Sequence, residues 1–306
     1  MKDKRMIGNL LLLFTAMIWG TAFAFQRSGM DAVEPATFNA ARMALAAVAV
    51  GAFALSRRKA IRRHDARDDS ARRASDRATL LGGLCCGLFL AAASILQQLG
   101  LVYTTAGKAG FLTAMYMLLV PLIERLLFRR RYPRTVWAAV ALGVAGLYLL
   151  SVRDGFSLAR GDALVIVCAL LFAGHILCCD RFAPRGDPVA IAAIQFAVAS
   201  LVSAVMAAFT EAPSLSGLAA AATAILYCGL VSGGVGYTLQ IVAQRMTDPT
   251  SASLLMSLES VFAVIGGALL LGEKMTGREK LGCAVMFAAI VLVQLPAAHK
   301  TKEQKD

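Results

Sequence analysis

Two ionisable side chains interrupt long apolar segments of this chain. Glu259 lies ten residues into an apolar segment that begins at Pro249, and Arg42 lies within the segment that follows Glu34. At ~1.5 Å per helical residue, Glu259 would lie about 15 Å into a hydrocarbon core that is ~30 Å thick. A carboxylate there costs about 2.5 kcal/mol or more unless it meets water or a partner. We expect Glu259 to face a polar cavity and to receive an ammonium group or a coupling proton; a hydrogen-bonded structural role is the alternative. Arg42 is a candidate for the same cavity, and its alternative is an arginine that reaches helix carbonyls.

A second group of residues could bind a soft metal ion. His175, Cys178 and Cys179 stand at positions i, i+3 and i+4, which share one face of a helix. Neutral imidazole and thiolate suit soft metals. The sequence indicates no fourth ligand, however, and all seven cysteines lie in apolar segments, as packing residues do. We therefore expect no metal site here, and we place His175 in the cavity as a polar residue.

Aromatic and amide side chains recur in the same apolar segments. Tyr103 and Phe172 are further aromatic residues that could line a cavity, and Ser257 and Ser260 flank the buried carboxylate. The predicted substrate-binding cavity consists of Trp19, Phe23, Arg42, Gln97, Tyr116, His175, Tyr237, Gln240 and Glu259.

The composition of the chain indicates the kind of secondary structure that carries these side chains. The chain is 58% hydrophobic and 16% charged, with a mean hydropathy of +0.67, whereas soluble domains average about 25% charged residues. Apolar segments of about 20 residues span a bilayer as helices. We predict an all-α integral membrane protein with ten transmembrane helices, and a charged cytoplasmic loop at Ser56–Arg77. The predicted spans are 6–27, 34–55, 78–102, 107–128, 134–152, 161–181, 188–210, 217–243, 249–271 and 278–296.

Several other classes of protein do not fit the sequence. The net charge is +12, but the basic residues lie between apolar segments rather than along one stripe, so we expect no nucleic-acid partner. The HExxH and Gly-x-Ser-x-Gly motifs are missing, which argues against an intramembrane enzyme, and we expect no cofactor. The basic N-terminus followed by an apolar segment is typical of signal peptides. This segment has an internal counterpart, however, and we predict a retained helix.

The chain carries a weak internal repeat. At an offset of 153 residues Gly8-Asn9 falls on Gly161-Asp162, and Arg42 falls on Gln195. From the third span onwards the offset is 143, so that Gln97 falls on Gln240 and Tyr116 on Glu259. We predict two five-helix repeats, at 1–152 and 153–306. Because five is odd, the repeats would cross the membrane in opposite senses, and secondary transporters of that architecture bind substrate near the midplane between the halves.

The basic residues predict the orientation of the chain. Most Lys and Arg residues fall in the N-terminus, 56–77, 125–134, 181–185 and the C-terminal tail, so both termini are expected in the cytoplasm. Turns at the two opposite faces then precede spans four and nine. We predict that these turns act as gates through Thr105 and Lys108 on one face and Asp248 and Thr250 on the other, with Asp248 as an N-cap.

Five motifs, spread over residues 6–296, resemble the EamA type of the drug/metabolite transporter superfamily. They are Trp19-Gly20, Arg42, Gly100–Leu112 (GLVYTTAGKAGFL), Pro121 and Leu271-Gly272-Glu273. The resemblance implies ten helices in two inverted repeats and the export of amino acids or related metabolites across a bacterial-type cytoplasmic (inner) membrane. Multidrug efflux and metabolite uptake are the alternatives. The chain departs from the pattern at Phe128–Arg131, where residues like Leu-Gly-Glu often recur, and at Phe172–His175, where a tryptophan is common. We expect the lipid bilayer and a small-molecule substrate as partners, and the sequence leaves monomer and homodimer open.

Overall fold

The computed structural model describes residues 2–62, 68–104, 106–151, 160–270 and 276–294, and these residues form helices joined by short turns, with no strand among them. The first half of the chain contains α1 (Lys2–Gly29), α2 (Pro35–Arg62), α3 (Asp69–Tyr103), α4 (Ala106–Ala114), α5 (Tyr116–Leu127) and α6 (Arg134–Ser151). The second half contains α7 (Arg160–Phe182), α8 (Pro188–Thr210), α9 (Leu215–Ala220), α10 (Ala222–Leu226), the π-helix η1 (Tyr227–Tyr237), α11 (Thr238–Ala243), α12 (Pro249–Met256), α13 (Glu259–Leu270) and α14 (Gly277–Gln294).

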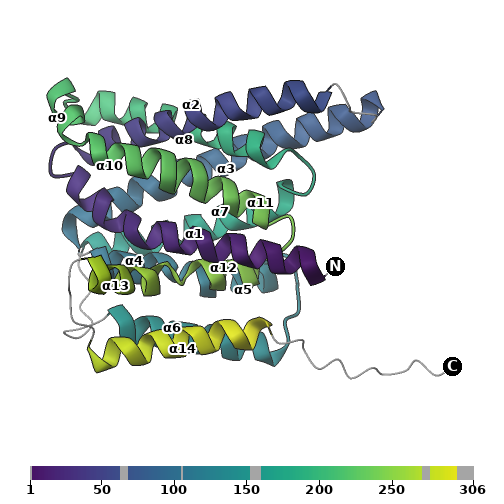
Figure 1. Ribbon diagram of the computed structural model, residues 1–306, viewed down its shortest axis with the longest axis vertical. Coiled ribbons are helices and arrows are strands. Elements are labelled where there is room, and N and C mark those ends of the chain that lie inside the picture. The colour runs from purple at the N-terminus through teal and green to yellow at the C-terminus, as the bar shows by residue number, and fades with distance from the viewer. Residues whose placement is uncertain (1, 63–67, 105, 152–159, 271–275, 295–306) are drawn as a thin grey trace.

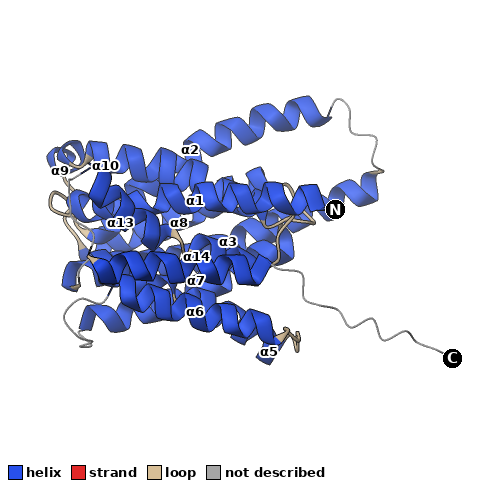
Figure 2. Ribbon diagram, turned by 60° about the horizontal axis from the view of Figure 1, so that its bottom comes forward, coloured by secondary structure: helices blue, strands red, loops and turns tan. Residues whose placement is uncertain are grey.

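The helices lie side by side as a layered bundle. In Figure 1, α2 and α8 form one edge of the stack, and α6 and α14 form the other. Between the two edges α3 packs against α7 and α8, and α1 packs against η1, α12 and α13. Figure 2 shows that the end of α2 and the beginning of α3 project beyond the bundle, at the end where α1 begins. Large apolar side chains remain exposed along the outer helices, for example Phe53, Leu88 and Val291, as expected for a surface that faces lipid.

Seven helices among the described residues are long and apolar enough to cross a membrane, and Arg134–Leu150 and Pro249–Ile265 are shorter apolar helices. A chain with so many apolar helices is a multi-pass membrane protein. Within the described residues, each predicted span overlaps one helix or consecutive helical segments. The described parts of the predicted loop at Ser56–Arg77 are mostly helical. There α2 continues to Arg62 and α3 begins at Asp69, where the side chain of Asp68 caps the backbone N–H of Ala71.

Two of the predicted spans are broken in the middle. Span four divides into α4 and α5 at Met115, and span nine divides into α12 and α13 at Ser257 and Leu258. In α5, Pro121 has no N–H to donate to the carbonyl group four residues earlier, close to the break. At the end of α12, the hydroxyl of Ser257 donates a hydrogen bond to the carbonyl oxygen of Leu254 at 2.7 Å, and local bonds of this kind bend helices. The two breaks lie at matching positions of the predicted repeat.

Span eight contains the π-helix. Its sequence is rich in glycine, and a Cβ at Gly229 would lie 2.9 Å from the carbonyl oxygen of Arg42, so η1 and α2 pack backbone to backbone. The indole Nε1 of Trp19 donates to the carbonyl oxygen of Ser232 at 3.1 Å. π-helical segments recur at functional sites. The space between α1, α2 and η1 is therefore a candidate site.

Helix starts agree with the predicted N-caps. Asp248 accepts a hydrogen bond from the backbone N–H of Ser251 at 2.9 Å, with Pro249 as the first residue of α12, as predicted. Asp187 caps α8 in the same way. The start of α2 is capped from another helix, since the carboxylate of Glu211 accepts from the backbone N–H groups of Ala36 and Thr37 at 2.7 Å each. The edge pair α2 and α8 is thus joined at its termini as well as along its length.

Candidate functional site

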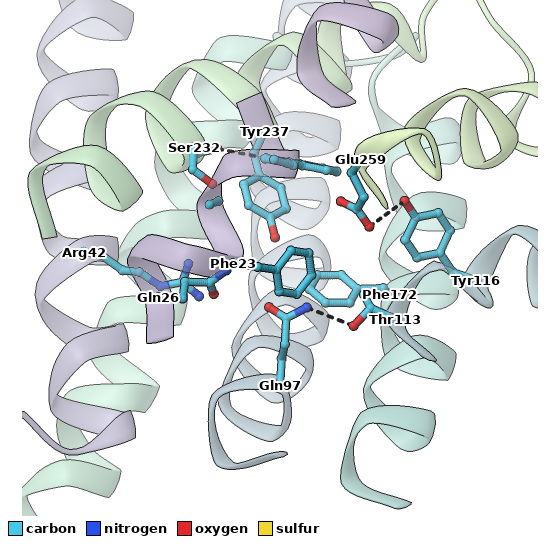
Figure 3. A pocket seen from close by; sticks show the side chains of 12 residues that line it. Phe23, Gln26, Arg42, Gln97, Thr113, Tyr116, Phe172, Ser232, Tyr237 and Glu259 are labelled. Atoms are coloured by element: carbon cyan, nitrogen blue, oxygen red, sulfur yellow. Dashed lines mark hydrogen bonds between the residues drawn. The ribbon is translucent and has the colours of Figure 1, made fainter. Parts of the chain in front are cut away.

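A cavity lies in the middle of the bundle, where the two helix breaks meet α1, α2 and η1. Its volume is about 40 Å³. Seven of the nine predicted cavity residues line it, and Figure 3 shows most of them pointing into one space. The lining consists of Trp19, Ala22, Phe23, Gln26, Arg42, Gln97, Thr113, Tyr116, Phe172, Ser232, Tyr237 and Glu259.

Glu259 and Tyr116 lie on one side of the cavity. Each is the first residue of the helix that follows a break, and the hydroxyl of Tyr116 donates to Oε1 of Glu259 at 3.3 Å. The carboxylate is 3% exposed, and no Lys, Arg or His nitrogen of the described residues lies within 4.0 Å of it. Nearby, the hydroxyl of Ser260 is buried with no hydrogen-bond partner in the described part of the chain. Ser260 does not itself line the cavity, so this side of the cavity offers the carboxylate of Glu259 as the group that can bind a donor.

The opposite side of the cavity carries a positive charge. Arg42 is 3% exposed, and its Nε donates to Oδ1 of Asn39 at 2.9 Å. The amide nitrogen of Asn39 donates to the hydroxyls of Ser94 and Ser203 at 2.9 and 2.8 Å. Because two hydroxyl groups on α3 and α8 take the amide N–H groups, the amide oxygen is turned toward Arg42. This buried network fixes the guanidinium at the cavity wall, across from Glu259 in Figure 3.

Aromatic rings lie between the two charges. The rings of Trp19 and Tyr237 lie 4.7 Å apart between centroids, and Phe23 and Phe172 complete the wall. Trp19 is held by its bond to the carbonyl of Ser232 in η1, so the π-helix positions the ring. The cavity therefore combines two opposite charges with an apolar surface between them.

The sequence reasoning did not include every polar lining residue. The amide of Gln97 donates to Oγ1 of Thr113 at 3.1 Å, and Gln26, which Gln98 contacts at 3.1 Å, also lines the cavity. The signal for Gln26 and Thr113 was weak, because a single amide or hydroxyl within an apolar helix is common. Their roles emerge only from the contacts that join separate helices.

Two predicted cavity residues lie outside the lining. His175 is fully buried behind Tyr237, with its ring edge-on to the tyrosine at 5.8 Å, and it contacts Oε1 of Gln195 at 2.9 Å. Gln240 is buried on α11 and donates to Oε1 of Gln244 at 3.1 Å. His175 thus contacts α8 and Gln240 contacts the C-cap of its own helix, and helical periodicity alone determines neither partner. Tyr103, a weaker candidate, is 59% exposed.

One end of the bundle is closed by a charged contact. Nζ of Lys108 lies 2.6 Å from Oδ2 of Asp162, whose side chain is fully buried, and the hydroxyl of Thr104 donates to the other carboxylate oxygen at 2.8 Å. The contact joins the start of α4 to the start of α7. Thr105, which we also predicted to act at this gate, lies outside the described residues.

The other end is closed by different chemistry at matching positions. The hydroxyl of Thr247 donates to Oδ1 of Asn9 at 3.2 Å, and Arg5 lies 3.6 Å from Asp248. Thr247 and Asn9 occupy the repeat positions of Thr104 and Asp162, respectively. Asn9 is thus neutral where Asp162 is charged, and the charged contact at this end is the separate pair of Arg5 and Asp248.

A buried carboxylate that the sequence reasoning missed reinforces this second end. Glu124 on α5 accepts from the hydroxyl of Thr250 on α12 at 3.0 Å and from Arg130 at 2.6 Å. The hydroxyl of Tyr132 also donates to it, and burial together with this bond raises the pKa of Tyr132. Thr250, one of the predicted gate residues, is therefore held by a cluster that joins α5 to α12.

The fold and the site define a multi-pass helical membrane protein with a central cavity and polar contacts at both ends of its bundle. Comparison with known protein families identifies its family. The EamA-like transporter family matches residues 6–152 and again residues 159–295. The chain belongs to that family, which bears out the resemblance seen in its motifs.

Individual relatives cover nearly the whole chain. An uncharacterized transporter of Archaeoglobus fulgidus is 28% identical over 296 residues, which cover 95% of this chain and 87% of the relative. A probable terminal-alkyne amino-acid exporter of Streptantibioticus cattleyicolor is 24% identical, with 95% of each chain covered. A solved crystal structure has a TM-score of 0.74 at 22% identity and covers 96% of this chain and 97% of its own, which shows the shared fold alone.

Proposed function

We propose that the protein is a secondary transporter that exports amino acids or related small metabolites by alternating access. The observation that carries the proposal is the central cavity, which places Arg42 and Glu259 on opposite sides of an aromatic wall. An α-amino acid has the complementary pair of charges, with its carboxylate for Arg42 and its ammonium for Glu259. The amino-acid exporter among the relatives is consistent with this class of substrate.

The aromatic wall favours substrates with an apolar side chain. Trp19, Phe23, Phe172 and Tyr237 offer a broad apolar surface between the charges, and burial of apolar area on it contributes about 25 cal/mol per Å². The two polar anchors orient the substrate, as in pockets that pair a mostly apolar wall with a few fixed polar groups. Small apolar and aromatic amino acids are therefore the first compounds to test.

Alternating access would follow from two inverted five-helix repeats, 1–152 and 153–306. The breaks at Met115 and Leu258 lie 143 residues apart, the predicted offset. Packing is matched too, since α3 contacts α7 and α8 whereas the equivalent η1 contacts α1 and α2. The edge pairs α2–α8 and α6–α14 join equivalent helices. Ten transmembrane segments related by a two-fold axis in the membrane plane would place the cavity at the midplane.

The two closures would serve as gates. The Lys108–Asp162 contact would seal the outer mouth, and the Asn9–Thr247 and Thr250–Glu124 contacts would seal the inner mouth. Basic residues at the start of α1, the end of α2 and the start of α3 gather at the second end, which supports cytoplasmic termini and an inner-membrane location.

Flux into proteoliposomes tests this function. Purified protein would be reconstituted and supplied with a panel of labelled amino acids, in the presence and absence of a proton gradient, with empty liposomes as the blank. We expect saturable movement of at least one apolar amino acid, and competition by the unlabelled compound but not by its decarboxylated amine. Folded protein that moves no amino acid, or that moves the amine equally well, would contradict the proposal.

A further inference from the structure

A cluster of three metal-ligating side chains lies behind the cavity wall. Cys86 on α3 and His175 and Cys179 on α7 are all buried, and their ligand atoms lie within 4.8 Å of one another. The sequence suggested only ligands from one helix, His175 with Cys178 and Cys179. The structure instead brings Cys86 from a distant segment to Cys179, while Cys178 is not part of the cluster.

The spacing of the sulfur atoms fits a single metal ion. Sγ of Cys86 lies 3.7 Å from Sγ of Cys179. Two thiolates bound to one Zn²⁺ at ~2.3 Å in tetrahedral geometry lie about 3.8 Å apart. The ring nitrogens of His175 lie 3.8 and 3.9 Å from Sγ of Cys179, which places the imidazole at a third corner.

The side-chain amide of Gln195 contacts the imidazole of His175 and can orient it for metal binding. Nε2 of His175 lies 2.9 Å from Oε1 of Gln195, and this oxygen accepts hydrogen bonds. When Nε2 donates to that oxygen, the lone pair of the neutral ring is left on Nδ1, which lies 3.9 Å from Sγ of Cys179. Metal-binding histidines regularly donate their other N–H to such an acceptor, which fixes the tautomer and the ring orientation.

We propose that Cys86, His175 and Cys179 form a binding site for a soft divalent metal ion, with Zn²⁺ as the expected ion. Binding converts the two thiols to thiolates and releases two protons, so that Zn²⁺ with two thiolates and a neutral imidazole has no net charge. A neutral complex suits the low-dielectric interior of the bundle. Three protein ligands leave a fourth coordination position for a small ligand such as water.

The bound ion would join the two halves of the chain, because α3 belongs to the first and α7 to the second. His175 also stands against Tyr237, which lines the central cavity. The ion would therefore hold His175 in place against Tyr237, and with it this wall of the cavity. This site does not depend on the proposed transport function, and its test does not use transport.

Metal content and absorption spectra test the site. The protein would carry an affinity tag without histidine, be reduced and stripped of metal, and then be titrated with Zn²⁺ or with Co²⁺. We expect one ion per chain, thiolate-to-cobalt charge-transfer absorption, and a higher unfolding temperature with Zn²⁺. X-ray absorption of the wild-type protein with zinc should show two sulfur ligands and a nitrogen ligand, a result that needs no variant.

Matched cysteines provide the controls. Cys86→Ala and Cys179→Ala should abolish stoichiometric binding and the shift in unfolding temperature. Cys85→Ala and Cys178→Ala, at half-buried neighbours on the same two helices, should leave both unchanged. The proposal is overturned if the wild-type protein takes up no Zn²⁺ or Co²⁺, if the bound ion has no sulfur ligands, or if the Cys178 variant loses the ion while the Cys86 variant keeps it.

Discussion

Tyr116 and Glu259 meet at the centre of the molecule, 143 residues apart, through a hydrogen bond of 3.3 Å. They occupy equivalent positions in the two halves of the sequence, and each begins the helix after a break. The hydrogen bond between this phenol and this carboxylate therefore joins equivalent positions of the two repeat copies. The same residues line the cavity, so the seam between the halves and the candidate binding site coincide.

The charge on Arg42 should decide which substrates are recognised. Arg42→Gln removes the charge that would bind a carboxylate, and the loss of such a charged hydrogen bond costs about 1.5–3 kcal/mol, or roughly tenfold or more in affinity. We expect KM to rise by that factor for amino acids in liposome flux. Arg58→Gln, on the projecting end of α2, is the control and should leave KM unchanged. An equal rise for both variants would argue against a role for Arg42 in the cavity.

Asn39 should act only through Arg42. Asn39→Ala removes the acceptor of Nε and leaves the hydroxyls of Ser94 and Ser203 without their shared donor. We predict a higher KM for amino acids, together with a lower unfolding temperature. In the double variant with Arg42→Gln, the two changes in KM should not add, because the residues share one network. Additive effects measured in this double-mutant cycle would separate Asn39 from the site.

Gly20 should be required for the approach of α1 to the break in span nine. A Cβ there would lie 2.7 Å from the carbonyl oxygen of Glu259 and 2.8 Å from the backbone nitrogen of Ala263. Gly20→Ala is expected to destabilise the protein by about 1–3 kcal/mol, because backbone must move to make room. Gly51→Ala is the matched control, since that position has no atom within 4 Å of the added Cβ. The measurement is the unfolding temperature in detergent, and equal temperatures for the two variants would contradict this packing.

The two ends should open in alternation. Asp162→Asn weakens the contact with Lys108 at one end and leaves Asn9 and Thr247 unchanged at the other. A cysteine introduced at Thr113 in an otherwise cysteine-free protein should then react faster with an impermeant thiol reagent added from the Lys108 side. Thr247→Val should have the opposite effect, raising reactivity from the other side. If both variants raise reactivity from both sides together, a channel rather than alternating access is indicated.

The inverted architecture predicts opposite exposure of two surface positions. A cysteine at Gly277, at the start of α14, should react from outside the cell, and one at Ser70, at the start of α3, from inside. Labelling of intact cells with an impermeant maleimide, before and after permeabilisation, measures this directly. Reaction of both positions from one side would be incompatible with the proposed topology.

The sequence predicts the helices well because apolar length is a strong signal, and it predicts much of the cavity because polar residues in apolar helices are few. It predicts neither helix breaks nor side-chain direction. His175 and Gln240 were expected in the cavity, yet His175 contacts Gln195 on α8 and Gln240 donates to Gln244 at the end of its own helix. Glu124 was missed because it lies near a helix end, where a carboxylate needs no special explanation. Cys86 was not expected beside Cys179, because a contact across 93 residues of sequence leaves no periodic pattern.

Glu259 is proposed to bind the substrate ammonium or a coupling proton, and the Glu259→Gln variant tests this role. This variant keeps the side-chain shape and an acceptor for Tyr116, and the matched control is Glu34→Gln in the turn before α2. Flux of the amino acid identified above would be measured in proteoliposomes across a range of pH. We predict that Glu259→Gln reduces transport at least about tenfold, or removes its dependence on pH, because a buried charge loses its partner at a cost of about 2 kcal/mol or more. A well-folded Glu259→Gln protein with the rate, affinity and pH profile of the wild type would contradict the account.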